Sequence, residues 1–405
     1  MDNIIYKTLP SGLILCLVKK SGFVRKHAML AFACGSVDTS FNGARVPDGT
    51  AHFLEHKLFE KKHGNIFDSF SALGADVNAF TGSDITAYYF SCCEGFEKCL
   101  SLLCKMACEP YFTDKGVERE KGIISSEITM YDDDPMWQAH FGMLGGLYGS
   151  HPAGVPVAGS RESIAEITAD TLDLFYKSFY TADNAILVAA GDIDENSFFE
   201  QAEKELKLSE EKRVQTTLPE STDIDRVLVK KRMPLASPVF AIGFKEKDFD
   251  MPPLMRTITS KILAHIIAGS GSVLYEKLYT SLLCSSPLGL DYICGRDFGA
   301  TVISGTSQNP ERLLSLLHSE IKNYLDYGIS DKNMQRIITK CRGRLMCSMD
   351  SPDFCCNLIA DNFTKSIKTL DIFDKYDTIN NSELLLRLEK HFAEDNLCLC
   401  EVSPE

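Results

Sequence analysis

The chain has 405 residues, of which 44% are hydrophobic and 24% are charged, which is enough for two or three domains with cores of their own. Its formal net charge of −14 argues against nucleic acid as a partner, because surfaces that bind nucleic acid are basic. It contains no run of eighteen apolar residues and no N-terminal signal-peptide pattern, so we expect no membrane partner. The fifteen cysteines form no Cys-x-x-Cys pair and predict free thiols in a reducing, cytoplasmic setting.

The first part of the chain alternates strand and helix signals. Apolar bursts on either side of a Lys-Lys-Ser-Gly turn predict two strands, and two β-rich runs around Gly82-Ser83 predict a hairpin. The expected strands cover residues 13–18, 28–34, 75–81, 85–92 and 184–190, the expected helices cover 65–73, 96–107 and 163–180, and a loop is expected at 145–159.

A His-x-x-Glu-His array, formed by His52, Glu55 and His56, lies between the first strands and the hairpin. If this segment is a helix with Asp48 as its N-cap, the two histidines share one face. Two neutral imidazoles placed in this way can bind one zinc ion, and Glu55 can reach a water on the same metal. The spacing is that of the inverted zincin motif.

A catalytic zinc usually has three protein ligands and one open position, so a third ligand is needed. A second helix is predicted to open at Thr113 or Asp114 and to end before Pro135. It carries Glu120 and Glu127, seven residues apart and therefore on one face. Spacing alone does not decide which of them is the ligand.

Four motifs together resemble the pitrilysin/insulinase family of zinc peptidases. They are His-Phe-Leu-Glu-His (52–56), Asn-Ala-Phe-Thr (78–81), Tyr-Tyr-Phe (88–90) and Glu-Arg-Glu-Lys-Gly-Ile-Ile-Ser-Ser-Glu (118–127). The resemblance covers nearly the whole chain and is closest to the short bacterial members, which have one pair of domains. It implies that Glu127 is the third ligand of one zinc per chain and that Glu120 steadies the site. The alternative is that both are solvated helix carboxylates.

The resemblance also implies a reaction and a mode of substrate binding. Water acidified by zinc is the expected nucleophile, and Glu55 is the expected general base. Asn78, Ala79 and Phe80 resemble the edge strand with which the family pairs the substrate backbone. Phe59 and Phe80 would line a hydrophobic subsite, although two phenylalanines are more often part of a core.

The second half of the chain repeats the first. Leu100–Leu103 matches Leu314–Leu317, and Ile167–Asn184 matches Ile379–Asn396, at offsets of 214 and 212. The predicted fold class is therefore α+β, with two duplicated domains that each have a mixed, mainly antiparallel sheet and helices packed against it. The predicted parts are a zinc-bearing domain at 1–205, a charged and polar linker at 206–222 and a related domain at 223–405.

The related domain has no second zinc motif. The segment 255–269 takes the place of the zinc helix and contains only His265, which we expect to serve packing. In the family, an arginine and a tyrosine of the second domain reach the site. Tyr292 matches that tyrosine, but Tyr279 stands where the arginine is expected. We therefore predict Tyr292 as a catalytic residue, with packing in a strand as the alternative.

The leading functional prediction is a zinc endopeptidase that cleaves short or unfolded peptides and forms a homodimer or a heterodimer with a related subunit. A first alternative is a non-catalytic or regulatory subunit, although such subunits usually lose one of the four key residues. A metal lyase of the S-ribosylhomocysteine type also uses His-x-x-Glu-His, but it is a single small domain. The resemblance also implies that the two domains enclose a chamber for the substrate. If acidic residues line this chamber, basic peptides should bind faster at low salt; otherwise the net charge serves solubility.

Overall fold

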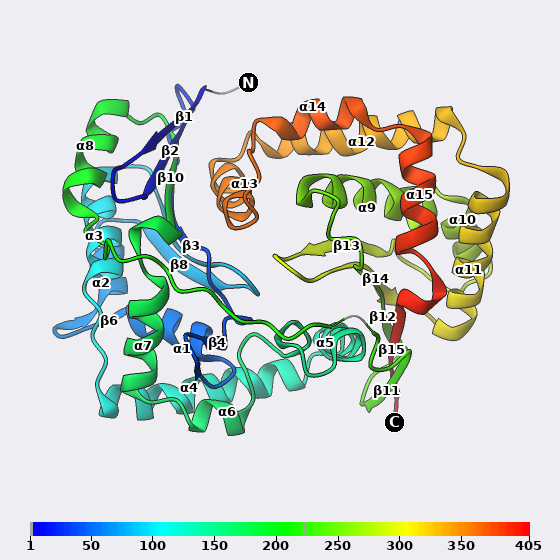
Figure 1. Cartoon of the computed structure of the whole chain (residues 1–405), viewed down its shortest axis with the longest axis horizontal. Coiled ribbons are helices and arrows are strands. Elements are labelled where there is room, and N and C mark those ends of the chain that lie inside the picture. Colours follow the sequence, from blue (N-terminus) through cyan, green and yellow to red (C-terminus); the bar gives the residue numbers. More distant parts are fainter. Residues whose placement is uncertain (1–2, 222) are drawn as a thin grey trace. The chain divides into compact units, whose positions relative to one another are not determined.

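The computed structural model describes residues 3–221 and 223–405, so Thr222 of the predicted linker lies outside the described residues. Two compact units, each with one large sheet and its own helices, make up the chain (Figure 1). The first unit consists of Met1–Ile128, Pro156–Leu218 and Met346–Thr369, and the second of Thr129–Val155, Pro219–Leu345 and Leu370–Glu405. The predicted α+β class with two sheet-and-helix halves is confirmed.

The sheet of the first unit has six strands in the order β1-β2-β10-β3-β9-β8. The strands are β1 (Asn3–Thr8), β2 (Ile14–Lys19), β3 (Lys26–Phe32), β8 (Asp76–Thr81), β9 (Thr86–Cys92) and β10 (Ala185–Gly191). All neighbours pair antiparallel except β2 and β10. Strand β8 therefore lies at the edge of the sheet.

The other elements of the first unit are short hairpins and helices. The hairpins are β4 (Ser40–Phe41) with β5 (Ala44–Arg45), and β6 (Glu60–Lys61) with β7 (Gly64–Asn65). The helices are α1 (Thr50–Leu58), α2 (Ile66–Ser71), α3 (Phe96–Cys108), α4 (Asp114–Asp132, which ends in the second unit), α6 (Arg161–Ala165), α7 (Ala169–Phe179), α8 (Glu195–Glu205) and α13 (Pro352–Thr364).

The second unit has five strands in the order β11-β15-β12-β14-β13. They are β11 (Leu228–Met233), β12 (Val239–Lys245), β13 (Gly289–Cys294), β14 (Gly299–Thr306) and β15 (Leu397–Pro404). Its helices are α5 (Pro135–Tyr148), α9 (Pro253–Ala268), α10 (Val273–Thr280), α11 (Pro310–Tyr327), α12 (Asp331–Ser348), α14 (Asp371–Thr378) and α15 (Asn381–His391).

The two sheets share one topology. Strands β2, β10, β3, β9 and β8 correspond in order to β11, β15, β12, β14 and β13. The parallel pair also falls at the same place in both sheets, between β2 and β10 and between β11 and β15. The internal repeat in the sequence is thus a repeat of a whole sheet.

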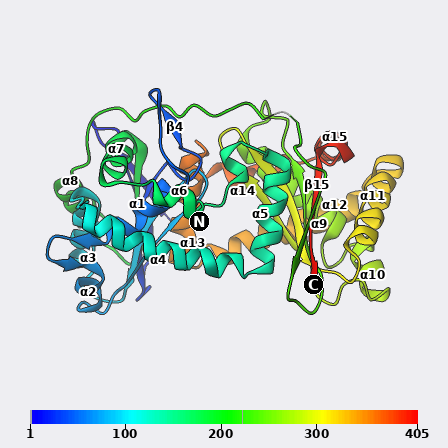
Figure 2. The same ribbon diagram turned by 90° about the horizontal axis from the view of Figure 1, so that it is seen from below.

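Each half of the sequence contributes one helix to the sheet of the other half. Helix α5, from the first half, packs on β12 and β15 (Figure 2), and α13, from the second half, packs on β10 and β3 (Figure 1). In α13, Cys356 and Ile359 are buried in one core with Met29 and Val188. The segments that fold together are therefore not contiguous in the sequence.

Helix α5 approaches β15 through glycines. A Cβ added to Gly142 would lie 2.5 Å from Cys400 Sγ, and one added to Gly146 would lie 2.4 Å from Cys398 Sγ. This helix is not predicted from the sequence, because three glycines among its fourteen residues weaken the helix signal. Close packing on the sheet explains two of these glycines, Gly142 and Gly146.

Three further details differ from the sequence-based expectations. The N-cap of α1 is Gly49, with φ of 90°, and not Asp48. A Cβ at Gly49 would lie 2.5 Å from the carbonyl oxygen of Ala158, so both its conformation and the space require glycine. The predicted helix at 163–180 is two helices: α6 ends at Ala165, and α7 begins after its N-cap residue, Thr168. Strand β1 is not anticipated as a separate element.

The stretch Pro253–Thr280, which contains α9 and α10, is long and apolar enough to cross a membrane by length and composition. However, 67% of its most apolar window is buried inside the fold, as in a core helix. Its hydropathy therefore gives no argument for a membrane span.

We predict opposite effects of one substitution in two helices. Gly146→Ala should lower the free energy of unfolding by about 1–3 kcal/mol, because the new methyl group overpacks the contact with β15. Gly122→Ala in α4 should leave it unchanged or raise it by up to about 1 kcal/mol, because no described atom outside its own helix lies within 4 Å and alanine favours helix. Urea denaturation measures both, and equal effects would contradict the close approach of α5.

Candidate metal centre

Helix α1 carries polar side chains into the interior of the first unit. It contacts α7 and β8, and His52 and Glu55 are only 8% and 7% exposed. Buried polar groups need partners, so their positions are informative. The partners come from α4 and from the edge strand β8.

Three donor groups converge from α1 and α4. His52 Nε2 lies 3.6 Å from Glu127 Oε1, and His56 Nε2 lies 3.5 Å from Glu127 Oε2. The ligand atoms of the three residues all lie within 4.8 Å of one another. Donors about 2.0–2.1 Å from a tetrahedral zinc are separated by about 3.3 Å, so this spacing fits the ion. Within the described part of the chain, these residues are the group of this kind that can bind a metal.

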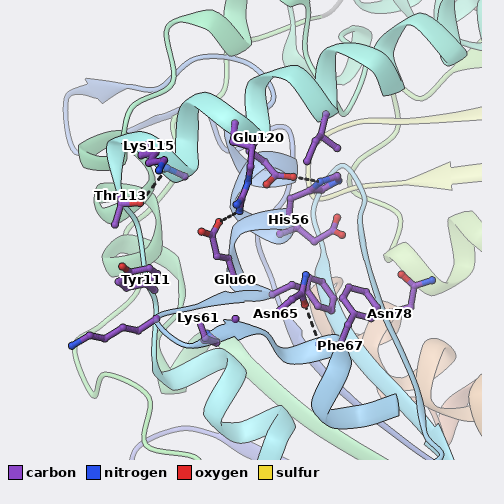
Figure 3. A pocket seen from close by; sticks show the side chains of 17 residues that line it. His56, Glu60, Lys61, Asn65, Phe67, Asn78, Tyr111, Thr113, Lys115 and Glu120 are labelled. Carbon is purple, nitrogen blue, oxygen red and sulfur yellow. Dashed lines mark hydrogen bonds and ion pairs between the residues drawn. The ribbon is translucent and has the colours of Figure 1, made fainter. Parts of the chain in front are cut away.

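Glu120 holds the second histidine in place. Its Oε1 lies 3.1 Å from His56 Nδ1, and Figure 3 shows the two side chains pointing toward each other. Because Nδ1 donates its hydrogen bond to this carboxylate, Nε2 is the ring nitrogen that can bind a metal on the side of Glu127. The position of Glu120 is that expected for a residue that orients a metal ligand, and the role itself stays a prediction.

The field in this site is negative. Burial alone would lower the pKa of His56, but its hydrogen bonds to Glu120 and Glu127 and the charge of Glu55 outweigh burial and raise that pKa to about 10. Carboxylates that stabilise an imidazolium so strongly would equally stabilise a metal cation. The donor set and its charge therefore both suit a divalent ion.

Glu55 sits on the same face with its carboxylate fixed. Burial raises the pKa of this group above its usual value, although His52 and His56 oppose the shift. Thr81, the last residue of β8, donates its hydroxyl proton to Glu55 Oε2 over 2.8 Å. Sequence reasoning assigned no role to Thr81, although it is part of the Asn-Ala-Phe-Thr motif.

The predicted substrate residues differ in their surroundings. Asn78 is exposed on β8 and lines a cavity of about 1,020 Å³ that begins at Glu55 and His56 (Figure 3). Phe59 also lines this cavity. Ala79 and Phe80 are half-buried, and Phe80 packs against the sheet core, as the alternative interpretation expects.

Comparison with known proteins places the chain in a family. A profile described as "Insulinase (Peptidase family M16)" matches residues 30–145, and one described as "Peptidase M16 inactive domain" matches residues 166–341. The whole chain is 30% identical over 428 aligned positions to "Uncharacterized zinc protease YmfH" of Bacillus subtilis (strain 168), of which it covers 97%. The chain belongs to the insulinase (M16) family. The predicted membership, in the short two-domain type, is confirmed.

Solved structures agree with this assignment. A protein of Alicyclobacillus acidocaldarius described as an M16-like peptidase matches with a TM-score of 0.95 at 29% identity, over 100% of this chain and 99% of that one. A "peptidase M16 inactive domain" from Pseudomonas fluorescens matches with a TM-score of 0.85 at 17% identity, over 100% and 98% of the two chains. This second likeness concerns the fold alone.

Tyr292 lies on β13 of the second unit of this M16 protein, in a buried ionic cluster. It is 5% exposed, and its hydroxyl donates to Glu246 Oε2 over 2.6 Å. The guanidinium of Arg387 also binds both oxygens of Glu246. The cluster explains why Tyr292 is buried, as the packing alternative expects, and its catalytic role stays a prediction that this geometry does not support. Tyr279, in the place expected for the family arginine, is 57% exposed on α10.

The first prediction for the site concerns metal binding. Glu127→Gln should lose most zinc, because it weakens one of three ligands. Glu120→Gln should keep the ion but lower its affinity about 10–100-fold, because His56 loses the carboxylate that orients it. Chelator competition and elemental analysis measure both effects. Glu118→Gln, on the same helix but exposed and paired with Lys121, is the matched control. Zinc binding that is equal in all three variants would contradict the site.

The second prediction concerns the buried cluster. Burial would raise the pKa of Glu246, but the hydrogen bonds and charge of Arg387 outweigh it and hold the pKa at about 2. Glu246→Gln should therefore lower the free energy of unfolding by about 3–5 kcal/mol at pH 7, because Arg387 keeps a buried charge without a counterion.

This loss should depend on pH. An unfolded glutamate has a pKa of about 4.3, so the stabilisation is complete above that pH and disappears as the pH falls toward the folded pKa of about 2. Denaturation of both proteins between pH 7 and pH 3 should show the difference narrowing below about pH 4. Glu311→Gln, an exposed partner of Lys230, should change stability by at most about 1 kcal/mol. A pH-independent difference would contradict the assignment.

Proposed function

We propose that this M16 protein is a zinc-dependent endopeptidase that hydrolyses short or unfolded peptides. The observation that supports it most is the joint placement of three donors and one carboxylate. His52, His56 and Glu127 face one another, and Glu55 projects from the same helix as the two histidines. Zinc fits these residues because of their spacing, their donor types and the negative field around them.

In this proposal each side chain has a defined task. Bound zinc would supply an acidified water and polarise the scissile carbonyl. Glu55 accepts a proton and later delivers it to the leaving amine. Thr81 fixes Glu55 through one oxygen, so that the other is directed to the proton. Glu120 keeps the Nδ1 proton of His56 in place and thereby keeps Nε2 available as a ligand.

The edge strand β8 is the proposed substrate platform. The N–H of Ala79 donates to the side chain of its neighbour, Asn78 Oδ1, over 2.8 Å in an exposed contact. We infer that this N–H faces the free edge of the sheet, where the carbonyl of an extended peptide could take the place of the Asn78 side chain. Binding through the backbone admits many sequences, so we expect side-chain preferences to come from the neighbouring cavity.

The alternative is a non-catalytic or regulatory partner of a peptidase heterodimer. Two observations favour it: Tyr279 replaces the expected arginine, and Tyr292 is buried in its own unit. The retained His52, Glu55, His56 and Glu127 favour catalysis.

We also propose that the protein forms a homodimer or a heterodimer with a related subunit. We propose a cytoplasmic setting as well, because a reducing compartment suits fifteen free thiols.

The prediction that separates chemistry from folding uses Glu55→Gln. It should lower kcat for a quenched-fluorescence peptide by at least about 100-fold, because it removes the base. Zinc content should change less than twofold, since the side chain at position 55 is not a ligand in the proposal. Glu118→Gln again serves as the control and should retain activity. Substantial turnover by Glu55→Gln with zinc bound would contradict the role of Glu55, and no hydrolysis by the wild-type chain or its complex would favour the regulatory alternative.

A further inference from the structure

The cavity beside the metal centre has an unusual charge for so acidic a protein. It lies within the first unit and is walled by α1, the β6–β7 hairpin, β8 and the beginning of α4. Its charged lining residues are the basic Lys61, Lys62, Lys115 and Arg119 and the acidic Glu55, Glu60 and Glu120. A count of these charges alone would make the cavity nearly neutral, but each acidic group already has a hydrogen-bond or ion-pair partner.

Each of the three carboxylates has a partner. Glu55 and Glu120 lie at the end of the cavity next to the metal centre, where they accept hydrogen bonds from Thr81 and His56. Glu60 is bound by two cations, the fully buried Lys57 and Arg119, the latter over 2.8 Å. Because two cations share one carboxylate, this group of three residues has a net positive charge of one. The part of the cavity away from the metal is therefore cationic.

The basic lining continues beyond this cavity. A second cavity of about 460 Å³ shares Lys61 and Lys62 with the first and adds Lys105, with Glu109 as its acidic residue. Lys61 donates to the carbonyl oxygens of Met106 and Glu109, so two of its three N–H groups are already used and it contributes mainly its charge. Lys62 and Lys115 are exposed. A chain with a net charge of −14 thus presents a basic groove that begins at its metal centre.

Aromatic rings form the apolar part of the same wall. Phe59 and Phe67 stack with their ring centroids 4.5 Å apart, and Tyr111 also lines the cavity (Figure 3). Such a surface can cover the methylene groups of a side chain while the charged end meets lysine or arginine. Because the cavity touches Glu55 and His56, a side chain inside it belongs to a residue beside the reacting bond.

We propose that this cavity is a substrate subsite that selects an acidic side chain, glutamate or aspartate, next to the scissile bond. The proposal rests on the peptidase function proposed above and adds the substrate class. Lys115 and Lys62 are the specificity-determining residues, since both are exposed and both line the cavity. A preference for basic peptides, which the net charge alone would suggest, is not expected from this lining.

The test compares peptides that differ at one position. Quenched peptides that carry Glu, Gln or Lys at each position around the cleaved bond are incubated with the zinc-loaded full-length protein. At one position, kcat/KM should be at least about tenfold higher for Glu than for Lys, with Gln between them, because several charges act together. Equal values at every position would overturn the proposal.

Variants then assign the preference to this cavity. Lys62→Glu with Lys115→Glu should reduce the Glu-to-Lys ratio at least about fivefold, because it lowers kcat/KM for the Glu peptide and raises kcat/KM for the Lys peptide. Lys98→Glu, on the exposed face of α3 and outside both cavities, is the control for added negative charge and should keep the wild-type ratio. An unchanged ratio in the double variant, with zinc content and circular dichroism intact, would overturn the assignment.

Binding separates this inference from the proposed function. If the wild-type protein cleaves none of the peptides, the peptidase proposal fails while the subsite can still be measured. Fluorescence anisotropy with Glu55→Gln should then show tighter binding of the Glu peptide than of the Gln and Lys peptides, and loss of that order in the double variant. Equal affinities for the three peptides would overturn the subsite.

Discussion

The site depends on one interaction: two histidines of α1 face the same carboxylate of α4. His52 and His56 lie one helical turn apart, and Glu127 bridges them from another helix. An array so dense in polar groups is costly inside a fold unless a cation is bound. The surrounding structure holds it nonetheless: Gly49 starts α1 against Ala158, and Glu120 fixes His56.

The exchange of helices between the halves has a consequence for stability and for evolution by duplication. Each sheet is covered by one helix from the other half of the sequence, α5 or α13, so neither half closes its own core alone. Cys356 and Ile359 show this directly, because they are buried against strands that precede them by more than 150 residues. A duplicated ancestor could reach this arrangement by swapping one element, which leaves both sheets complete.

The sequence predicts the parts whose pattern is local. The His-x-x-Glu-His spacing, the β-rich runs that form β8 and β9, and the repeat of Leu100–Leu103 in Leu314–Leu317 are all read within short windows. It does not predict α5, because glycines that serve packing on β15 weaken the helix signal. Nor does it predict that Thr81 binds Glu55, or that Lys57 and Arg119 share Glu60, since these contacts depend on how the side chains are placed in the fold. Tyr292 shows the same limit, because its partners Glu246 and Arg387 are visible only in the fold.

The metal environment is the most direct measurement of the central claim. X-ray absorption spectroscopy at the zinc edge, on protein loaded with one equivalent, reports which atoms bind the metal and how far away they are. The account predicts two imidazole nitrogens and carboxylate or water oxygens at about 2.0–2.1 Å, with no sulfur. Sulfur scattering at about 2.3 Å would show that some of the fifteen cysteines bind the ion instead, and would contradict the assignment of His52, His56 and Glu127.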